Sequence, residues 1–253
     1  MTTYDLGIQM YGSIDAPALV LGPSLGTTRT TWDAVLPKLA ERFHVLRYDH
    51  LGHGDSDVPP GPYTLDDLTG ALAAAMEAHG INRAHLAGLS LGGMVALQLA
   101  ATYPHLVDRL AVVCASAYLP PAQNWLDRAS AVRNGGMAAV ADTVLGRWFT
   151  PAFAESPAAQ TVRADLLSTP VEGYAGCCEA IAAMDLRPLL RAIQAPTLVI
   201  AGAEDPATPV DHAEAIAARV QGPARVEVVA GAAHLASVER PDDVSRILLA
   251  HLQ

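Results

Sequence analysis

The 253-residue sequence is poor in cysteine, with only Cys114, Cys177 and Cys178. The number is odd and two of the three residues are adjacent, which fits neither a disulfide framework nor the ligand spacing of a zinc site. We therefore expect reduced thiols and no metal.

Basic residues are also scarce. The chain has 16 lysines and arginines against 26 aspartates and glutamates, which gives a formal net charge of −10. Binding to nucleic acid or to an anionic membrane surface requires clustered positive charge. The charge balance therefore argues against both kinds of partner.

We expect neither a targeting segment nor a membrane-spanning helix. The first residues, MTTYDLGIQMYG, contain no basic segment followed by an apolar core. No apolar run reaches the roughly 18 to 20 residues that a membrane-spanning helix needs. These absences predict an acidic protein of the cytoplasm.

What the chain does contain is a regular alternation of two patterns. Helical patterns such as 64–80, with Thr64 as N-cap and Gly80 as C-cap, and 240–253 alternate with short apolar segments rich in β-formers. Such near-continuous apolar strands are typical of a parallel sheet covered on both faces. The order predicts a doubly wound α/β fold. The expected strands lie within 17–24, 43–50, 84–90, 109–117, 195–205 and 224–234.

The alternation stops between about residues 119 and 193, where we find no convincing strand. Four helical segments are expected there instead, at 122–134, 136–149, 157–169 and 172–184. We interpret residues 1–118 and 194–253 as the α/β core and 119–193 as an inserted helical cap, or lid.

Ser90 stands at the junction of an apolar strand and a helix, in the segment HLAGLSLGGMVALQLA. Residues 88–92 match G-x-S-x-G in the strand-to-helix context that makes this motif a nucleophile elbow. Glycine is needed at Gly88 and Gly92 because larger side chains would meet neighbouring backbone in so tight a turn. The alternative is that Ser90 only caps the following helix.

A serine nucleophile needs a general base, and that base needs an acid to orient it. In this kind of fold the acid and the histidine follow late strands, in the chain order serine, acid, histidine. Asp205 follows the strand 195–203 and His234 follows the strand 224–230, so both are expected beside Ser90.

Alternatives exist for both partners. Glu204 is adjacent to Asp205, but the D-P-A-T-P sequence favours Asp205 because it precedes a rigid proline turn. His50 and His53 lie in YDHLGHGDS, a loop near the same edge of the sheet, although the glycines around His53 indicate a structural turn.

Two backbone N–H groups are expected to stabilise the oxyanion that Ser90 would create. One is that of Leu91, at the start of the helix. The other should come from the loop after the first predicted strand, in LGPSLGTTRTTW, where the position points to Leu25. An ordinary loop is the alternative.

With these residues placed, the chain resembles the α/β-hydrolase superfamily and, within it, the 3-oxoadipate enol-lactonases of the β-ketoadipate pathway. The resemblance rests on the blocks GPSLGTT, RYDHLGHGDSDVPPGPYTLDDL, GLSLGG, RWFTPAF, GYAGCCEAIAAMDLRPLL and PTLVIAGAEDPATP. It implies Ser90, Asp205 and His234 as triad and Leu25 and Leu91 as backbone donors. One departure is Leu51, where many relatives have arginine.

The resemblance implies hydrolysis of 3-oxoadipate enol-lactone through an acyl-enzyme, without a cofactor, by a monomer or small homo-oligomer. The free carboxylate of such a substrate needs a cation or oriented donors in a protein of this charge. Arg133 and Arg147 of the cap are candidates, with Trp125 and Trp148 as apolar walls. A generic carboxylesterase or lactonase, a cofactor-free perhydrolase and, more distantly, a non-catalytic small-molecule receptor are alternatives.

Overall fold

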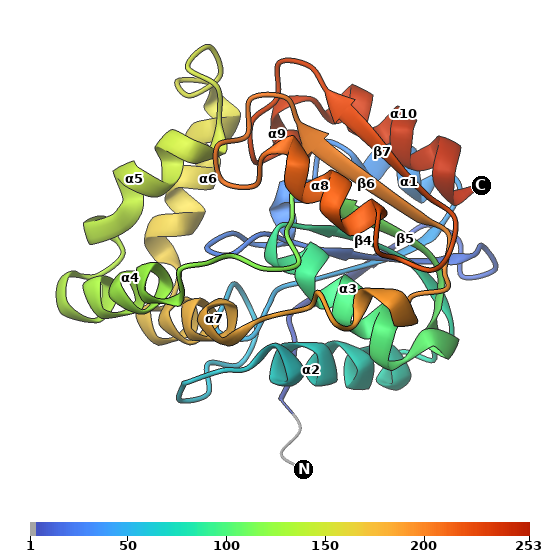
Figure 1. Cartoon of the computed structure of the whole chain (residues 1–253), viewed down its shortest axis with the longest axis horizontal. Coiled ribbons are helices and arrows are strands. Elements are labelled where there is room, and N and C mark those ends of the chain that lie inside the picture. The colour runs from blue at the N-terminus through green and yellow to red at the C-terminus, as the bar shows by residue number, and fades with distance from the viewer. Residues whose placement is uncertain (1–3) are drawn as a thin grey trace.

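The computed structural model describes residues 4–253 and is built around a seven-stranded sheet of order β1-β3-β2-β4-β5-β6-β7 (Figure 1). Strands β2 to β7 are parallel, so the predicted doubly wound fold is confirmed. Strand β1 is an antiparallel edge strand on β3 that the sequence did not predict. The strands are β1 Ile8–Tyr11, β2 Ala18–Gly22, β3 His44–Tyr48, β4 Ala84–Leu89, β5 Val107–Val113, β6 Thr197–Gly202 and β7 Ala224–Val229.

The centre of the sheet is apolar on both faces. Every residue of β4 is buried, and its register sets Val20 of β2 beside Leu86 and Gly22 beside Gly88. Successive residues of a strand point to opposite faces of the sheet. Because helices cover both faces, the side chains on either face pack against helices rather than facing water. This explains the continuous apolar runs in the sequence.

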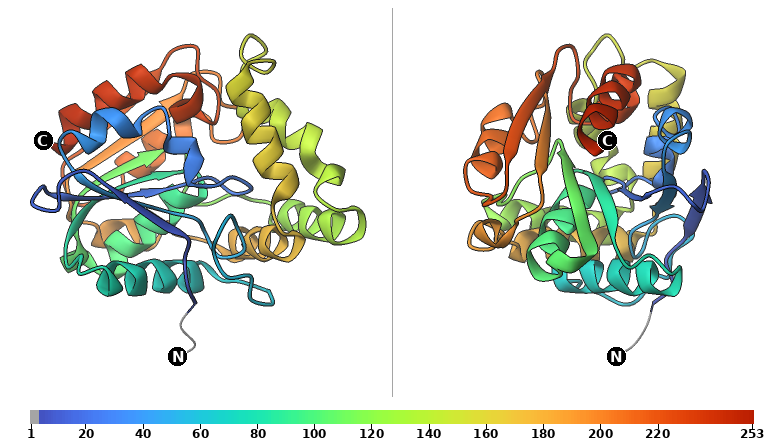
Figure 2. Two further views of the ribbon diagram at one scale, coloured as in Figure 1. Left: turned by 180° about the vertical axis from the view of Figure 1, so that it is seen from behind. Right: turned by 90° about the vertical axis from the view of Figure 1, so that its right-hand side faces the viewer.

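Helices cover the two faces unequally, as Figures 1 and 2 show. Helix α3 packs against β4, β5 and α2, and α8 packs against β6 and β7 on the same side. Helix α10 contacts β5 and β7 from the other side, beside α1. The core helices are α1 Leu36–Ala40, α2 Leu65–Ala78, α3 Leu91–Thr102, α8 Val210–Ala217, α9 Ala236–Glu239 and α10 Pro241–Leu252.

Local signals in the sequence set the ends of α2. The Thr64 side chain accepts a hydrogen bond from the Asp67 backbone, and the Asp67 carboxylate accepts one from the Thr64 backbone, which forms a capping box. Gly80 follows the helix with φ +71°, the left-handed conformation that glycine adopts without steric cost. The predicted N-terminal signal at Thr64 and the predicted C-terminal signal at Gly80 are therefore both present at the ends of α2.

Four helices lie between β5 and β6 in the chain and stack at one end of the sheet (Figure 2, left). Their ends fall within two residues of the predicted ones. Helices α4 and α7 pack extensively against each other, and α5 contacts both α4 and α6. We call this segment the cap. Its helices are α4 Ala122–Gly135, α5 Ala138–Trp148, α6 Pro157–Ser168 and α7 Val171–Ala183.

The three cysteines are all buried and unbridged. Burial raises the pKa of each thiol, that of Cys178 to about 12, so these are inert packing residues at neutral pH. None of the helices in residues 4–253 combines the length and apolarity required to cross a membrane.

Candidate active site

The predicted site residues meet at the carboxyl ends of the parallel strands. Ser90 follows β4 directly, Asp205 follows β6 and His234 follows β7. Leu25 lies in the loop after β2, and this loop contacts the segment that follows β3. A parallel sheet collects such loops at one edge, which is where α/β proteins bind ligands.

Ser90 occupies a strained turn between β4 and α3. Its φ of 53° and ψ of −112° are rare for a residue with a side chain, and such outliers gather at functional sites. A Cβ at Gly88 would lie 2.1 Å from the Gly92 carbonyl oxygen, and one at Gly92 would lie 2.4 Å from the Gly22 carbonyl oxygen. Both glycines are thus required sterically, and the Ser90 side chain caps no backbone group of α3.

The side chains of Ser90, His234 and Asp205 form one hydrogen-bonded row. His234 Nε2 lies 2.8 Å from Ser90 Oγ, and His234 Nδ1 lies 2.8 Å from Asp205 Oδ2. The Asp205 carboxylate accepts a hydrogen bond from Nδ1–H, which keeps the ring proton on Nδ1 and leaves Nε2 free to accept the Ser90 hydroxyl proton. All three residues are buried.

Asp205 is held as an ionised acceptor. Burial acts to raise its pKa, but the charge and hydrogen bond of His234 and the donors of Thr208 outweigh it, so the pKa lies below its ordinary value. Thr208 donates through Oγ1 to Oδ2 at 2.7 Å and through its backbone N–H to Oδ1 at 3.0 Å. The Ala207 N–H donates to Oδ1 at 2.8 Å.

The alternative candidates for the acid and the base are not part of this hydrogen-bonded row. Glu204 is exposed, whereas the Asp205 side chain is fully buried against His234. His50 and His53 are buried, and their ring nitrogens bond backbone groups at Pro23, Gly26 and Leu51. The turn that the sequence suggested around these histidines is present.

The loop that holds the His234 imidazole is fixed through Ala233. The Ala233 N–H donates to Glu239 Oε2 at 2.9 Å, and its carbonyl oxygen accepts from Cys114 Sγ at 3.8 Å. Glu239 Oε1 accepts from the backbone N–H and the hydroxyl of Thr150, two residues after the end of α5. Sequence reasoning missed Glu239 because its partner Thr150 is 89 residues away.

The two predicted oxyanion donors, Leu25 and Leu91, are both buried residues, and Leu25 lines the same cavity as Ser90. Leu91 is the first residue of α3, where N–H groups have no partner within the helix. Leu25 is buried in the loop after β2. Within residues 4–253 neither N–H donates to a backbone carbonyl, which leaves both available to an oxygen in the site.

A cavity of about 110 Å³ opens above Ser90 and His234, between the cap and the sheet edge. Trp125, Arg147 and Trp148, the predicted substrate-binding residues, line it. Arg128, which was not predicted from the sequence, also lines it. Its position three residues after Trp125, on the same face of α4, was the available signal.

Two arginines line the cavity even though the chain is acidic. No aspartate or glutamate belongs to its lining, and neither Arg128 nor Arg147 forms an ion pair within residues 4–253. The Arg128 guanidinium lies 4.5 Å from the Trp125 ring centre, which holds it in place by a cation–π contact.

Arg133, the other predicted cation, lies elsewhere. Its guanidinium pairs with Glu172 at 3.1 Å and with Glu179 at 2.5 Å, and it does not line the cavity. These carboxylates neutralise it and raise its pKa. The structure therefore gives the expectation for Arg133 no support, because its charge is already used in joining α4 to α7.

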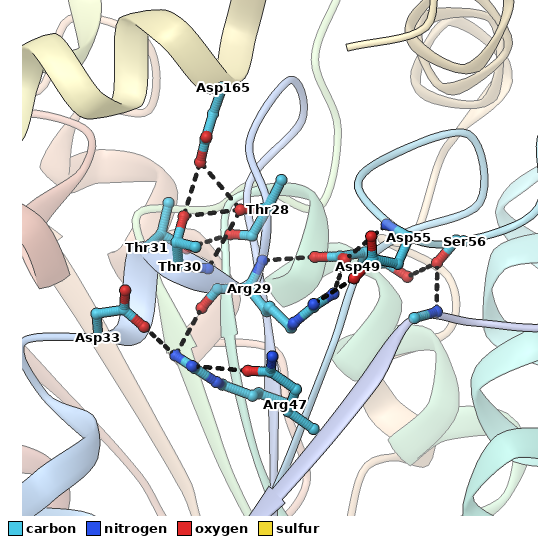
Figure 3. A network of polar contacts seen from close by, with 12 residues as sticks. Thr28, Arg29, Thr30, Thr31, Asp33, Arg47, Asp49, Asp55, Ser56 and Asp165 are labelled. Carbon is cyan, nitrogen blue, oxygen red and sulfur yellow. Dashed lines mark hydrogen bonds and ion pairs between the residues drawn. The ribbon is translucent and has the colours of Figure 1, made fainter. Parts of the chain in front are cut away.

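The loop after β2 is anchored at several points (Figure 3). Asp165 of α6 accepts hydrogen bonds from the hydroxyls of Thr28 and Thr30, at 2.9 and 2.7 Å, and so joins the cap to this loop. The Arg29 guanidinium pairs with Asp49 and Asp55, and its backbone N–H donates to Asp49 at 2.7 Å. The network fixes the part of this loop that follows Leu25 in the chain.

No metal centre is formed in the described part of the chain: residues 4–253 contain no group of three His, Cys, Asp or Glu side chains arranged to hold an ion. The arrangement present is suited to nucleophilic attack by a hydroxyl on an acyl carbon.

Comparison with known proteins gives consistent matches over most of the chain. The model of the alpha/beta hydrolase fold family matches residues 17–241. A 3-oxoadipate enol-lactonase of Acinetobacter baylyi is 37% identical over 245 residues, which cover 95% of this chain and 91% of the relative. An enol-lactonase from Burkholderia xenovorans superposes with a TM-score of 0.95 at 37% identity, covering 98% of this chain and 96% of its own. A hydrolase from Pseudomonas aeruginosa gives 0.95 at 43% identity, with 98% and 94% covered.

Proposed function

The chain belongs to the alpha/beta hydrolase fold family, and we propose that it hydrolyses 3-oxoadipate enol-lactone to 3-oxoadipate, a step in the catabolism of aromatic compounds. The observation that carries the proposal is that Ser90 and His234 of the hydrogen-bonded row line the same cavity as Arg128 and Arg147. The similarity to enol-lactonases supports the choice of lactone.

The proposed reaction begins with Ser90. His234 Nε2, 2.8 Å from Ser90 Oγ, accepts the hydroxyl proton as Oγ attacks the lactone carbonyl carbon. The carbonyl oxygen becomes an oxyanion, and the N–H groups of Leu25 and Leu91 donate to it. Asp205 holds the ring of His234 and stabilises the imidazolium that forms.

The ring then opens. The carbon–oxygen bond of the lactone breaks and its electron pair leaves on an enol oxygen, whose charge is delocalised, while the imidazolium returns the proton. The acyl group stays on Ser90 until His234 activates a water molecule to hydrolyse the ester. The released enol becomes 3-oxoadipate by tautomerisation.

Arg128 and Arg147 supply the charge complement for a substrate that keeps a free carboxylate. A guanidinium binds a carboxylate through two parallel hydrogen bonds, which fixes orientation as well as charge. Trp125 and Trp148 provide apolar contacts for the carbon chain. A generic esterase would not need this positive end of the cavity.

The direct test follows enol-lactone consumption by ultraviolet absorbance, with p-nitrophenyl acetate as a comparison substrate. We expect kcat/KM to favour the lactone clearly, and Ser90→Ala to lower the rate by about 10⁴ to 10⁶. A preference for the simple ester would support a generic esterase instead. Ligand binding without any Ser90-dependent turnover would indicate a receptor.

The carboxylate assignment has a matched control. Arg128→Gln and Arg133→Gln are the same change on the same helix, but only Arg128 lines the cavity. Loss of a hydrogen-bonded charge pair should lower kcat/KM for the lactone about 10- to 100-fold in Arg128→Gln. Arg133→Gln should leave the kinetics near wild type, and equal effects would contradict the assignment.

A further inference from the structure

Two buried histidines outside the catalytic row lie in the turn after β3. His50 and His53 are 1% and 0% exposed, and neither is among the residues that line the cavity. Burying an imidazole requires hydrogen-bond partners for its ring nitrogens. The identity of those partners indicates what the two residues do.

His53 joins the turn to the loop that carries Leu25. The Gly26 N–H donates to His53 Nε2 at 2.9 Å, and His53 Nδ1 lies 3.1 Å from the Leu51 carbonyl oxygen. Because Nε2 accepts, the ring proton is on Nδ1 and the ring is neutral. Burial lowers the pKa of His53 to about 4, which keeps Nε2 an acceptor at neutral pH.

His50 holds the other end of the same loop. Its Nε2 lies 2.9 Å from the Pro23 carbonyl oxygen, to which it donates. The same oxygen accepts from the Gly92 N–H at 2.9 Å. Pro23 is thereby attached to the first turn of α3, one residue after Leu91. Leu25 lies between two fixed points, Pro23 and Gly26.

The turn is itself held against the cap. A Cβ at Gly52 would lie 2.1 Å from the Gly173 Cα, so the turn and α7 are in direct backbone contact. Cys177 Sγ of α7 is 3.7 Å from the Leu51 carbonyl oxygen, which also faces His53 Nδ1. His53 therefore connects a rigid support to Gly26.

We propose that His53 is a positioning residue of the oxyanion hole: its Nε2 fixes Gly26 and thereby aims the neighbouring Leu25 N–H at the oxyanion. His50 secures the opposite end of the loop. The inference rests on the proposed role of Leu25 and Leu91, and it holds for any ester on which Ser90 acts. How strongly such donors stabilise the transition state depends on their placement to within less than about 1 Å.

The test compares two substitutions of similar size at the same position. The Gln side-chain oxygen in His53→Gln reaches the place of Nε2 and can accept from Gly26. The amide in His53→Asn reaches only the place of Nδ1 and keeps the contact with Leu51. If His53 only stabilised its own turn, Asn would replace it as well as Gln or better. If His53 positions Gly26, only Gln should preserve activity.

Hydrolysis of p-nitrophenyl acetate gives the readout, which does not depend on the lactone assignment. We expect His53→Asn to lower kcat about 100-fold with KM little changed, since loss of one oxyanion donor costs about 10² to 10³. His53→Gln should recover most of that loss. The control His251→Asn removes a buried histidine bonded to the Leu110 carbonyl, remote from the cavity, and should keep kcat near wild type.

A second readout is affinity for a trifluoromethyl ketone, which adds to the serine and carries an oxyanion. Its binding should weaken in His53→Asn by the same factor as kcat/KM. The proposal is overturned if both variants fold with equal kcat, if Asn is the more active, or if His251→Asn loses as much. Should His53→Asn not fold, a His53→Gln protein with ketone affinity reduced 100-fold would equally contradict it.

Discussion

A single buried carboxylate connects the cap to the loop of His234, and its removal should be costly. Glu239 is 6% exposed. It accepts from the Thr150 N–H at 3.1 Å, the Thr150 hydroxyl at 2.5 Å and the Ala233 N–H at 2.9 Å. No lysine or arginine pairs with it in residues 4–253. Its charge is therefore balanced by donors alone.

The cost of Glu239→Gln follows from these contacts. The substitution replaces one carboxylate oxygen with an NH₂ group. Either the two donors of Thr150 or the Ala233 N–H then lose their acceptor and face another donor. Hydrogen bonds to charged groups contribute about 1.5–3 kcal/mol each, and an unsatisfied buried N–H costs about 1–3 kcal/mol. We expect Glu239→Gln to lower the free energy of unfolding by about 3 kcal/mol.

Urea unfolding followed by tryptophan fluorescence measures this change. The control Glu227→Gln makes the same substitution at a 40% exposed side chain that pairs with Arg225, and should change stability by less than about 0.5 kcal/mol. Thr150→Val removes one donor and should have a smaller effect than Glu239→Gln. A Glu239→Gln protein as stable as the Glu227→Gln protein would refute the reasoning.

Other consequences concern buried histidines and glycines. Burial lowers the pKa of His50 to about 3 and of His53 to about 4, so below pH 6.5 the unfolded chain binds protons that the folded chain excludes. Stability should fall by about 1.4 kcal/mol per pH unit for each histidine as pH decreases from 6.5 towards 4; urea midpoints independent of pH would contradict this. Gly52→Ala, at φ +74° and 2.1 Å from backbone, should lower Tm and weaken cap packing. Gly70→Ala in α2 meets no atom within 4 Å and should stabilise by about 0.5–1 kcal/mol, so a lower Tm there would contradict the helix argument.

Much of the fold was predictable from local patterns. The apolar strands and the Thr64 cap use only neighbouring residues, and the order of strands and helices restricts the topology. Strand β1 escaped prediction because its residues Ile8–Tyr11 are partly exposed on an edge and follow no apolar run.

The candidate site was predictable where strand ends determine it. Ser90, Asp205 and His234 could be placed because each lies in the short segment that follows the carboxyl end of a strand. Arg128 and Arg133 could not be distinguished, since the carboxylates that pair with Arg133 come from another helix, α7. The same holds for Glu239, whose role depends on packing between distant segments.

The most direct test of the account is the identity of the acylated residue. Rapid quenching of the protein with p-nitrophenyl acetate, followed by peptide mass spectrometry, should locate the acetyl group on Ser90, with label absent in Ser90→Ala. Acetylation of another residue at wild-type rate, or undiminished turnover by Ser90→Ala, would contradict the proposal that the hydroxyl 2.8 Å from His234 Nε2 starts the reaction.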